Sequence, residues 1–97
     1  MYARVATFQT DPAKLEGMIG EMRRNIEDTE PPEGLEDTKA VYILVDRESG
    51  KQMSIVLFDS EDGMRRGHEA LSAMSPPEEM GQRTDVGLYE VPIHMSR

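Results

Sequence analysis

The sequence contains neither cysteine nor tryptophan, and none of its apolar runs approaches the length of a membrane span. Without cysteine, the chain cannot form disulfides, thiolate metal sites or a cysteine nucleophile. Met1 is followed directly by a strand-like alternation, where a signal peptide would have an apolar core. We therefore expect a cytoplasmic protein that does not enter a membrane.

Positive charge is also scarce. The chain has 11 Lys and Arg against 19 Asp and Glu, which gives a net charge of −8. The adjacent basic pairs, Arg23-Arg24 and Arg65-Arg66, both fall within expected helices. Because phosphate backbones are bound by larger clusters of basic residues, we expect neither nucleic acids nor anionic membrane surfaces as partners.

The 97 residues suffice for one modest core, so we expect a single domain over residues 1–97. Hydrophobic periodicity predicts the order strand, helix, strand, strand, helix, strand. The predicted strands span about residues 2–9, 38–46, 51–59 and 84–92, and the helices follow Asp11-Pro12 and either Asp59 or Ser60. This order predicts a ferredoxin-like βαββαβ fold of the α+β class, with a four-stranded antiparallel sheet and both helices on one face.

Each predicted helix has one apolar stripe. Leu15, Met18, Ile19, Met22 and Ile26 form the first stripe, and Met64, Gly67 or His68, Leu71 and Met74 form the second. Gly17 and Gly20 each weaken the first helix by roughly 1 kcal/mol relative to alanine. We expect these glycines to let the helix lie close to the sheet. The acidic, proline-containing segment 27–37 predicts a loop.

The central hairpin is apolar on both faces. Tyr42 and Leu44 alternate with Ile43 and Val45, and the second strand has the same pattern, with Ile55 and Leu57 opposed to Val56 and Phe58. We expect Ile43 and Val56 to lie on opposite faces of the sheet. Since helices cover only one face, the other would leave a large apolar patch in water, so we predict a homodimer packed through the bare sheet faces.

His68 is the leading candidate for a catalytic base or ligand-binding group, because its spacing places it on or beside the helix face that meets the sheet. The alternative is a histidine at the edge of the stripe that bonds to a neighbour. Tyr42, Tyr89 and Asn25 are candidate ligand-binding residues; strand packing is the alternative for the tyrosines, and helix capping or exposure for Asn25. His68 and His94 have no neighbours at ligand spacing, so we expect no metal site.

Several segments resemble one known family. These are the "PPEG" at residues 31–34, the turn at residues 46–50, the Phe58-Asp59-Ser60 run and the "VGLYEV" at residues 86–91. Together they are similar to the dimeric α/β-barrel superfamily, in its antibiotic-biosynthesis-monooxygenase-like branch. The resemblance spans nearly the whole chain and implies a homodimer. The activities that it implies range from cofactor-free oxygenation of aromatic polyketides to haem degradation.

The chain departs from this branch at several positions. Phe58 stands where many relatives have tryptophan, and the first strand offers Thr7 and Gln9 where haem-degrading relatives have asparagine. We therefore do not expect haem or any other cofactor. Two functional hypotheses remain: a cofactor-free monooxygenase acting on an aromatic or polyketide-like molecule bound between sheet and helices, and a non-catalytic ligand-binding or stress-related dimer.

Overall fold

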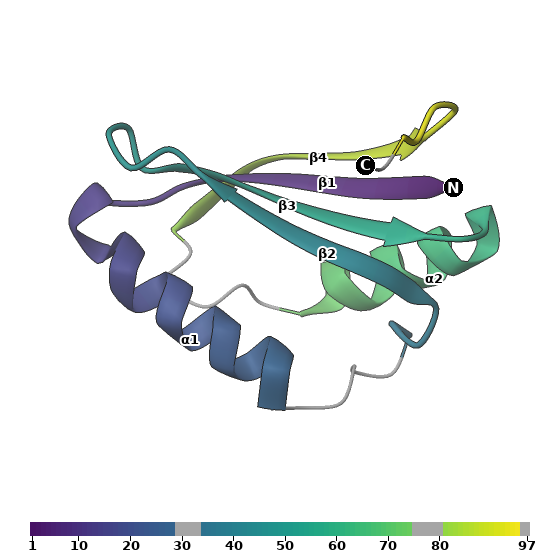
Figure 1. Cartoon of the computed structure of the whole chain (residues 1–97), viewed down its shortest axis with the longest axis horizontal. Coiled ribbons are helices and arrows are strands. Elements are labelled where there is room, and N and C mark those ends of the chain that lie inside the picture. Colours follow the sequence, from purple (N-terminus) through teal and green to yellow (C-terminus); the bar gives the residue numbers. More distant parts are fainter. Residues whose placement is uncertain (29–33, 75–80, 96–97) are drawn as a thin grey trace.

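The computed structural model describes residues 1–28, 34–74 and 81–95, with only the backbone of residues 25, 26 and 28. It shows one four-stranded antiparallel sheet with two helices on the same face (Figure 1). The elements are β1 (Tyr2–Gln9), a 3₁₀ turn (Pro12–Lys14), α1 (Leu15–Asp28), β2 (Thr38–Val45), β3 (Lys51–Phe58), α2 (Glu61–Ala73) and β4 (Gln82–Glu90). The predicted ferredoxin-like βαββαβ fold is confirmed.

The local signals for turns and helix starts are confirmed in detail. The carboxylate of Asp11 accepts a hydrogen bond from the amide of Ala13, and the hydroxyl of Ser60 accepts one from the amide of Gly63 at the start of α2. In the hairpin turn, Gly50 has a φ of +80°, as predicted for the glycine there. The last strand begins two residues earlier than predicted and ends at Glu90, before Pro92.

The strand order is β2-β3-β1-β4, so β1 and β3 are central. Directly paired residues lie on the same face, and the register pairs Ile43 with Ser54, Ser54 with Ala6, and Arg4 with Val56. Ile43 and Val56 are therefore both on the helix-facing side, and the expectation of opposite faces is wrong. The hairpin turn sets the cross-strand register, which alternation within each strand does not reveal.

Two apolar clusters fill the space between sheet and helices. Under α1, the buried side chains are Ala6, Phe8, Leu15 and Met18. Under α2, they are Val56, Phe58 and Met64, with Leu35 and Leu71 packed against them. The core is thus divided into one half for each helix.

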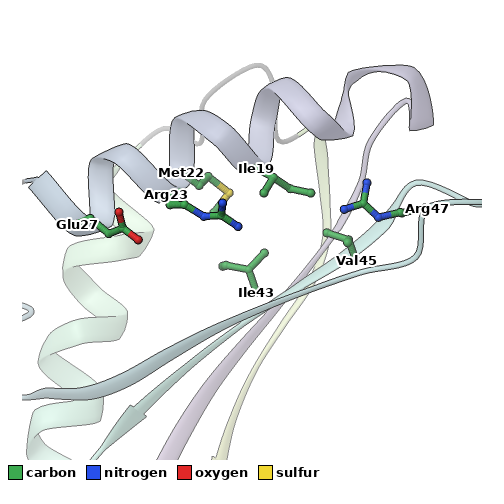
Figure 2. A pocket seen from close by; sticks show the side chains of 7 residues that line it. All are labelled: Ile19, Met22, Arg23, Glu27, Ile43, Val45 and Arg47. Atoms are coloured by element: carbon green, nitrogen blue, oxygen red, sulfur yellow. The ribbon is translucent and has the colours of Figure 1, made fainter.

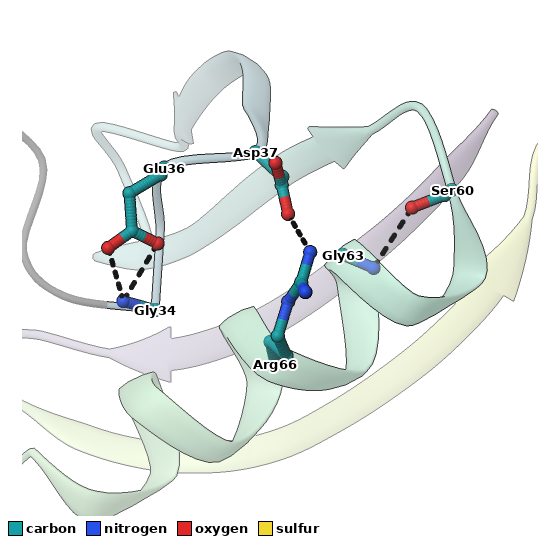
Figure 3. Close-up of polar contacts among 6 residues, drawn as sticks. All are labelled: Gly34, Glu36, Asp37, Ser60, Gly63 and Arg66. Carbon is teal, nitrogen blue, oxygen red and sulfur yellow. Dashed lines mark hydrogen bonds and ion pairs between the residues drawn. The ribbon is translucent and has the colours of Figure 1, made fainter.

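A short segment before β2, residues 34–37, is bound to α2 by an ion pair (Figure 3). Asp37 forms an ion pair with Arg66 of α2, and the carboxylate of Glu36 accepts hydrogen bonds from the amide of Gly34. Gly34 has a φ of +93°, and a Cβ there would lie 2.8 Å from the Cβ of Ala70. The segment can approach α2 this closely because residue 34 has no side chain.

No helix of the described residues covers the other face of the sheet (Figure 1). Tyr42, Leu44 and Tyr89 on this face are 55, 48 and 52 % exposed. Ile55 and Leu57 lie between them on β3, half-buried. We call this surface the outer face. No helix among the described residues is long and apolar enough to cross a membrane.

Candidate ligand-binding site

A pocket of about 360 Å³ lies between α1 and the edge strand β2. Its apolar wall is formed by Ile19 and Met22 from α1 and by Ile43 and Val45 from β2 (Figure 2). All four side chains are half-buried, although they lie between the two layers of the fold. The volume is within the roughly 300–1,000 Å³ typical of small-molecule sites.

Charged residues surround the apolar wall. Arg23 and Glu27 come from α1 and Arg47 from the hairpin turn, and Figure 2 shows the Arg23 side chain extending beneath the helix toward Ile43. Arg47 also forms an ion pair with Glu16, which ties the turn to α1. A pocket of this kind can bury an apolar body and keep the polar atoms of a ligand near its charged edge.

Arg4 is the one charged residue that is buried among those the structure describes, with 4 % of its surface exposed. It lies on central strand β1 and faces the helices. Its Nη2 atom is buried and has no hydrogen-bond partner in the described part of the chain. Burial and, secondarily, the nearby positive charge of Arg83 lower the pKa of Arg4 from its usual value. A buried cation without a carboxylate partner is costly, so this group requires an explanation.

His68 contacts this arginine. The Nε of Arg4 donates a hydrogen bond to Nδ1 of His68 on α2, over 3.1 Å. Because Nδ1 accepts this bond, it carries no proton, and the ring proton of the neutral histidine is on Nε2. His68 therefore has the arrangement that we described as the alternative to a catalytic base, a histidine bonded to a neighbour.

Gln52 is a second buried residue whose side chain has polar atoms that bond to no described residue. It is 1 % exposed, and neither its amide oxygen nor its amide nitrogen has a partner among the described residues. It lies on β3 opposite Phe8 and Val45, hence on the helix-facing side beside the pocket wall. Buried amides are normally hydrogen-bonded, so the Gln52 amide is an exception among the described residues.

The sequence-predicted site residues do not converge. Tyr42 and Tyr89 lie on the outer face, on opposite edge strands and across the sheet from His68. Asn25 belongs to α1, the helix that covers the pocket, but its side chain lies outside the described part of the structure. Their roles in binding stay predictions.

Arg4 and Gln52 were missed by sequence reasoning. The signal was present for Arg4, because Arg4 alternates with Ala6 and Phe8 and must share their buried face. A charged residue in that register is unusual and points to a site. Among residues 1–28, 34–74 and 81–95, no group of three or more His, Asp or Glu could hold a metal ion.

Comparison with known proteins supports the fold. No protein-family model and no curated protein sequence matches the chain. A solved structure from Deinococcus radiodurans, named as a "putative antibiotic biosynthesis monooxygenase", is similar over 100 % of this chain and 98 % of its own, with a TM-score of 0.53 and 13 % identity. At this identity the similarity establishes a shared fold, in agreement with the resemblance seen in the sequence.

Proposed function

We propose that the protein binds a mostly apolar small molecule, of aromatic or polyketide-like type, in the pocket between α1 and β2. The observation that carries this proposal is the pocket itself, with its half-buried wall of Ile19, Met22, Ile43 and Val45. Exposed apolar side chains inside a concave site are stabilised when a ligand removes them from water. A cytoplasmic location stays a prediction.

Binding of 2-naphthol, followed by its fluorescence, tests this proposal without interference from tryptophan. Replacing Ile43 with Phe fills the pocket and should weaken binding at least tenfold. Tyr42→Phe is the matched control, because residue 42 is adjacent in sequence but lies on the outer face. Saturable binding that is lost only in Ile43→Phe supports the proposal. No binding, or equal loss in both variants, contradicts it.

We also propose that the protein is a homodimer in which two outer faces pack together. Across the sheet, one row of paired residues runs Tyr42, Ile55, Val5, Gly87, and the next runs Ala40, Leu57, Ala3, Tyr89. Each row therefore has a tyrosine at one edge and a small residue at the other. Tyr89 of the same chain lies over Gly87, so a second copy related by a two-fold axis would cover the exposed apolar side chains of both rows.

Sedimentation velocity tests the dimer. The wild-type protein should sediment as a dimer, and Ile55→Asp, at the centre of the outer face, should convert it to a folded monomer because a carboxylate would be buried without a partner. Ser72→Asp introduces the same charge at an exposed position of α2 and should leave the dimer intact. A dimer that survives Ile55→Asp would place the interface elsewhere.

Cofactor-free oxygenation is a second candidate function, favoured by the shared fold with the Deinococcus protein and by the Arg4–His68 pair beneath α2. In such a reaction, O₂ oxidises a CH₂ group of an anthrone-type substrate to a carbonyl, and the second oxygen atom leaves as water. Oxygen uptake by metal-free and flavin-free protein would test it, with His68→Ala as the variant. Uptake no faster than the uncatalysed reaction would leave the protein as a non-catalytic binder.

A further inference from the structure

Between the pocket and Arg4, the side chains on the helix-facing side of the two central strands are small. Ile43 of the pocket wall is paired with Ser54, and Ser54 is paired with Ala6. Arg4 lies two residues before Ala6 on the same face of β1, roughly 7 Å along the strand. The helix-facing residues between the pocket and the arginine are thus Ser54 and Ala6, and both have small side chains.

The exposure of Ser54 differs from that of its neighbours on the same strand. It lies on a central strand between Gln52 and Val56, which are 1 % and 6 % exposed, yet Ser54 itself is only half-buried. Its place is also between the two apolar clusters, one under each helix. Ser54 is therefore more accessible than its neighbours on the helix-facing side of β3.

No carboxylate of a described residue is paired with Arg4. None of the ion pairs between described residues involves Arg4, its Nε bond goes to a neutral acceptor, and Nη2 has no partner there. Arg83, opposite Phe8 on β4, adds a second positive charge nearby. Planar guanidinium groups bind planar oxyanions especially well.

We propose that Arg4, oriented by His68, binds an oxyanion, either a carboxylate or a phenolate oxygen, of the flat apolar ligand whose body occupies the pocket between α1 and β2. This inference rests on the proposed pocket and adds the chemical class of its ligand. The oxyanion supplies the missing partner of Nη2 and neutralises the buried charge. His68 is a positioning residue in this arrangement, since its contact is with Arg4.

A chromogenic phenol distinguishes this site from a merely apolar one. An apolar pocket disfavours the charged form of 4-nitrophenol and raises its pKa, whereas a buried cation lowers it. We expect the yellow phenolate to form at lower pH when 4-nitrophenol is bound to the wild-type protein than when it is free. In Arg4→Met, the pKa of bound 4-nitrophenol should instead be higher than that of the free phenol. Tyr42→Phe, a change on the outer face, should keep the wild-type direction.

The carboxylate is tested with 2-naphthoate and its neutral isostere 2-naphthamide, by calorimetry. The wild-type protein should bind the naphthoate roughly tenfold more tightly, the factor expected of one hydrogen bond between charged groups, and Arg4→Met should lose this preference. The two probes also show which oxyanion the site prefers.

Two results separate this inference from the proposed function. If 4-nitrophenol binds wild-type protein with a raised pKa, and naphthoate has no advantage over naphthamide, the pocket is correct and the oxyanion site is overturned. If no probe binds, both proposals fail. The direction of the 4-nitrophenol pKa shift is measured on the wild-type protein alone, so the test does not depend on the folding of Arg4→Met.

Discussion

The two helices cover the same face of the sheet, but α2 packs against it more closely than α1 does. Beneath α2, Gly67 lies against Phe58, which is 0 % exposed, and a Cβ at residue 67 would be 2.5 Å from the phenyl ring. Beneath α1, the half-buried Ile19 and Met22 line a pocket. The half-core under α2 is therefore closely packed at Gly67, whereas the half-core under α1 has space for a ligand.

The glycines of α1, unlike Gly67 of α2, do not pack against the sheet. We expected Gly17 and Gly20 to permit close packing on the sheet, but a Cβ at either position would meet nothing within 4 Å. The expectation was wrong because both glycines point away from other parts of the chain. Helix α1 keeps the cost of two glycines without the packing that Gly67 provides in α2.

The largest expected effect is loss of the aromatic ring beneath α2. Phe58→Ala should lower the free energy of unfolding by about 3–5 kcal/mol, because the fully buried ring leaves a cavity. The corresponding change beneath α1, Met22→Ala, should cost clearly less, because Met22 already borders a pocket. Urea denaturation of both variants tests the comparison, and equal losses would contradict it.

Gly67→Ala should have the next largest effect. The added methyl group would force Phe58 or the whole helix to move, and overpacking of this kind costs typically about 1–3 kcal/mol. The measurement is again the free energy of unfolding in urea. A variant as stable as the wild type would show that α2 can rise from the sheet without loss.

Gly20→Ala should stabilise the protein, by about 0.5–1 kcal/mol, since alanine has less conformational freedom to lose on helix formation and the new methyl group has open space. Compared with Gly67→Ala, the same substitution has the opposite sign in the other helix. A destabilised Gly20→Ala would indicate that α1 is packed more tightly than the structure shows.

The smallest effect concerns the hairpin turn beside the pocket. The amides of Glu48 and Ser49 donate hydrogen bonds to Asp46 and lower the pKa of its exposed carboxyl. A carboxyl with a lowered pKa stabilises the fold above its unfolded pKa of about 3.9, and this contribution disappears as the pH falls through the lower folded value. Wild type should therefore be more stable than Asp46→Asn at pH 7, with the gap closing in acid. A gap that is constant with pH would contradict this assignment.

The sequence predicted local structure well because the signals were local. Asp11-Pro12, Ser60 and Gly50 act through their own turns and caps, and all three positions are confirmed. Prediction from the sequence failed where strands that are far apart in the chain pair with each other. The faces of Ile43 and Val56 depend on cross-strand register, and the burial of Arg4 depends on which face of β1 the helices cover.

The candidate site was predicted only in part. His68 was correctly placed on the side of α2 that meets the sheet, but its partner Arg4 is 64 positions away in the chain and no periodicity connects the two. Tyr42 and Tyr89 carry suitable hydroxyls, but strand parity sends them to the outer face. The pocket itself results from the distance between α1 and β2, which no sequence pattern reports.

The most direct test of a ligand pocket beneath α1 is an NMR titration of protein with ¹³C-labelled methionine methyl groups, using 2-naphthol as the ligand. Three methionines report on three places: Met22 in the pocket wall, Met64 in the closed half-core under α2 and Met53 on the outer face. We predict a saturable shift of the Met22 methyl signal, with the Met53 signal unchanged. A shift at Met53 alone would place the ligand on the outer face and contradict the proposed pocket.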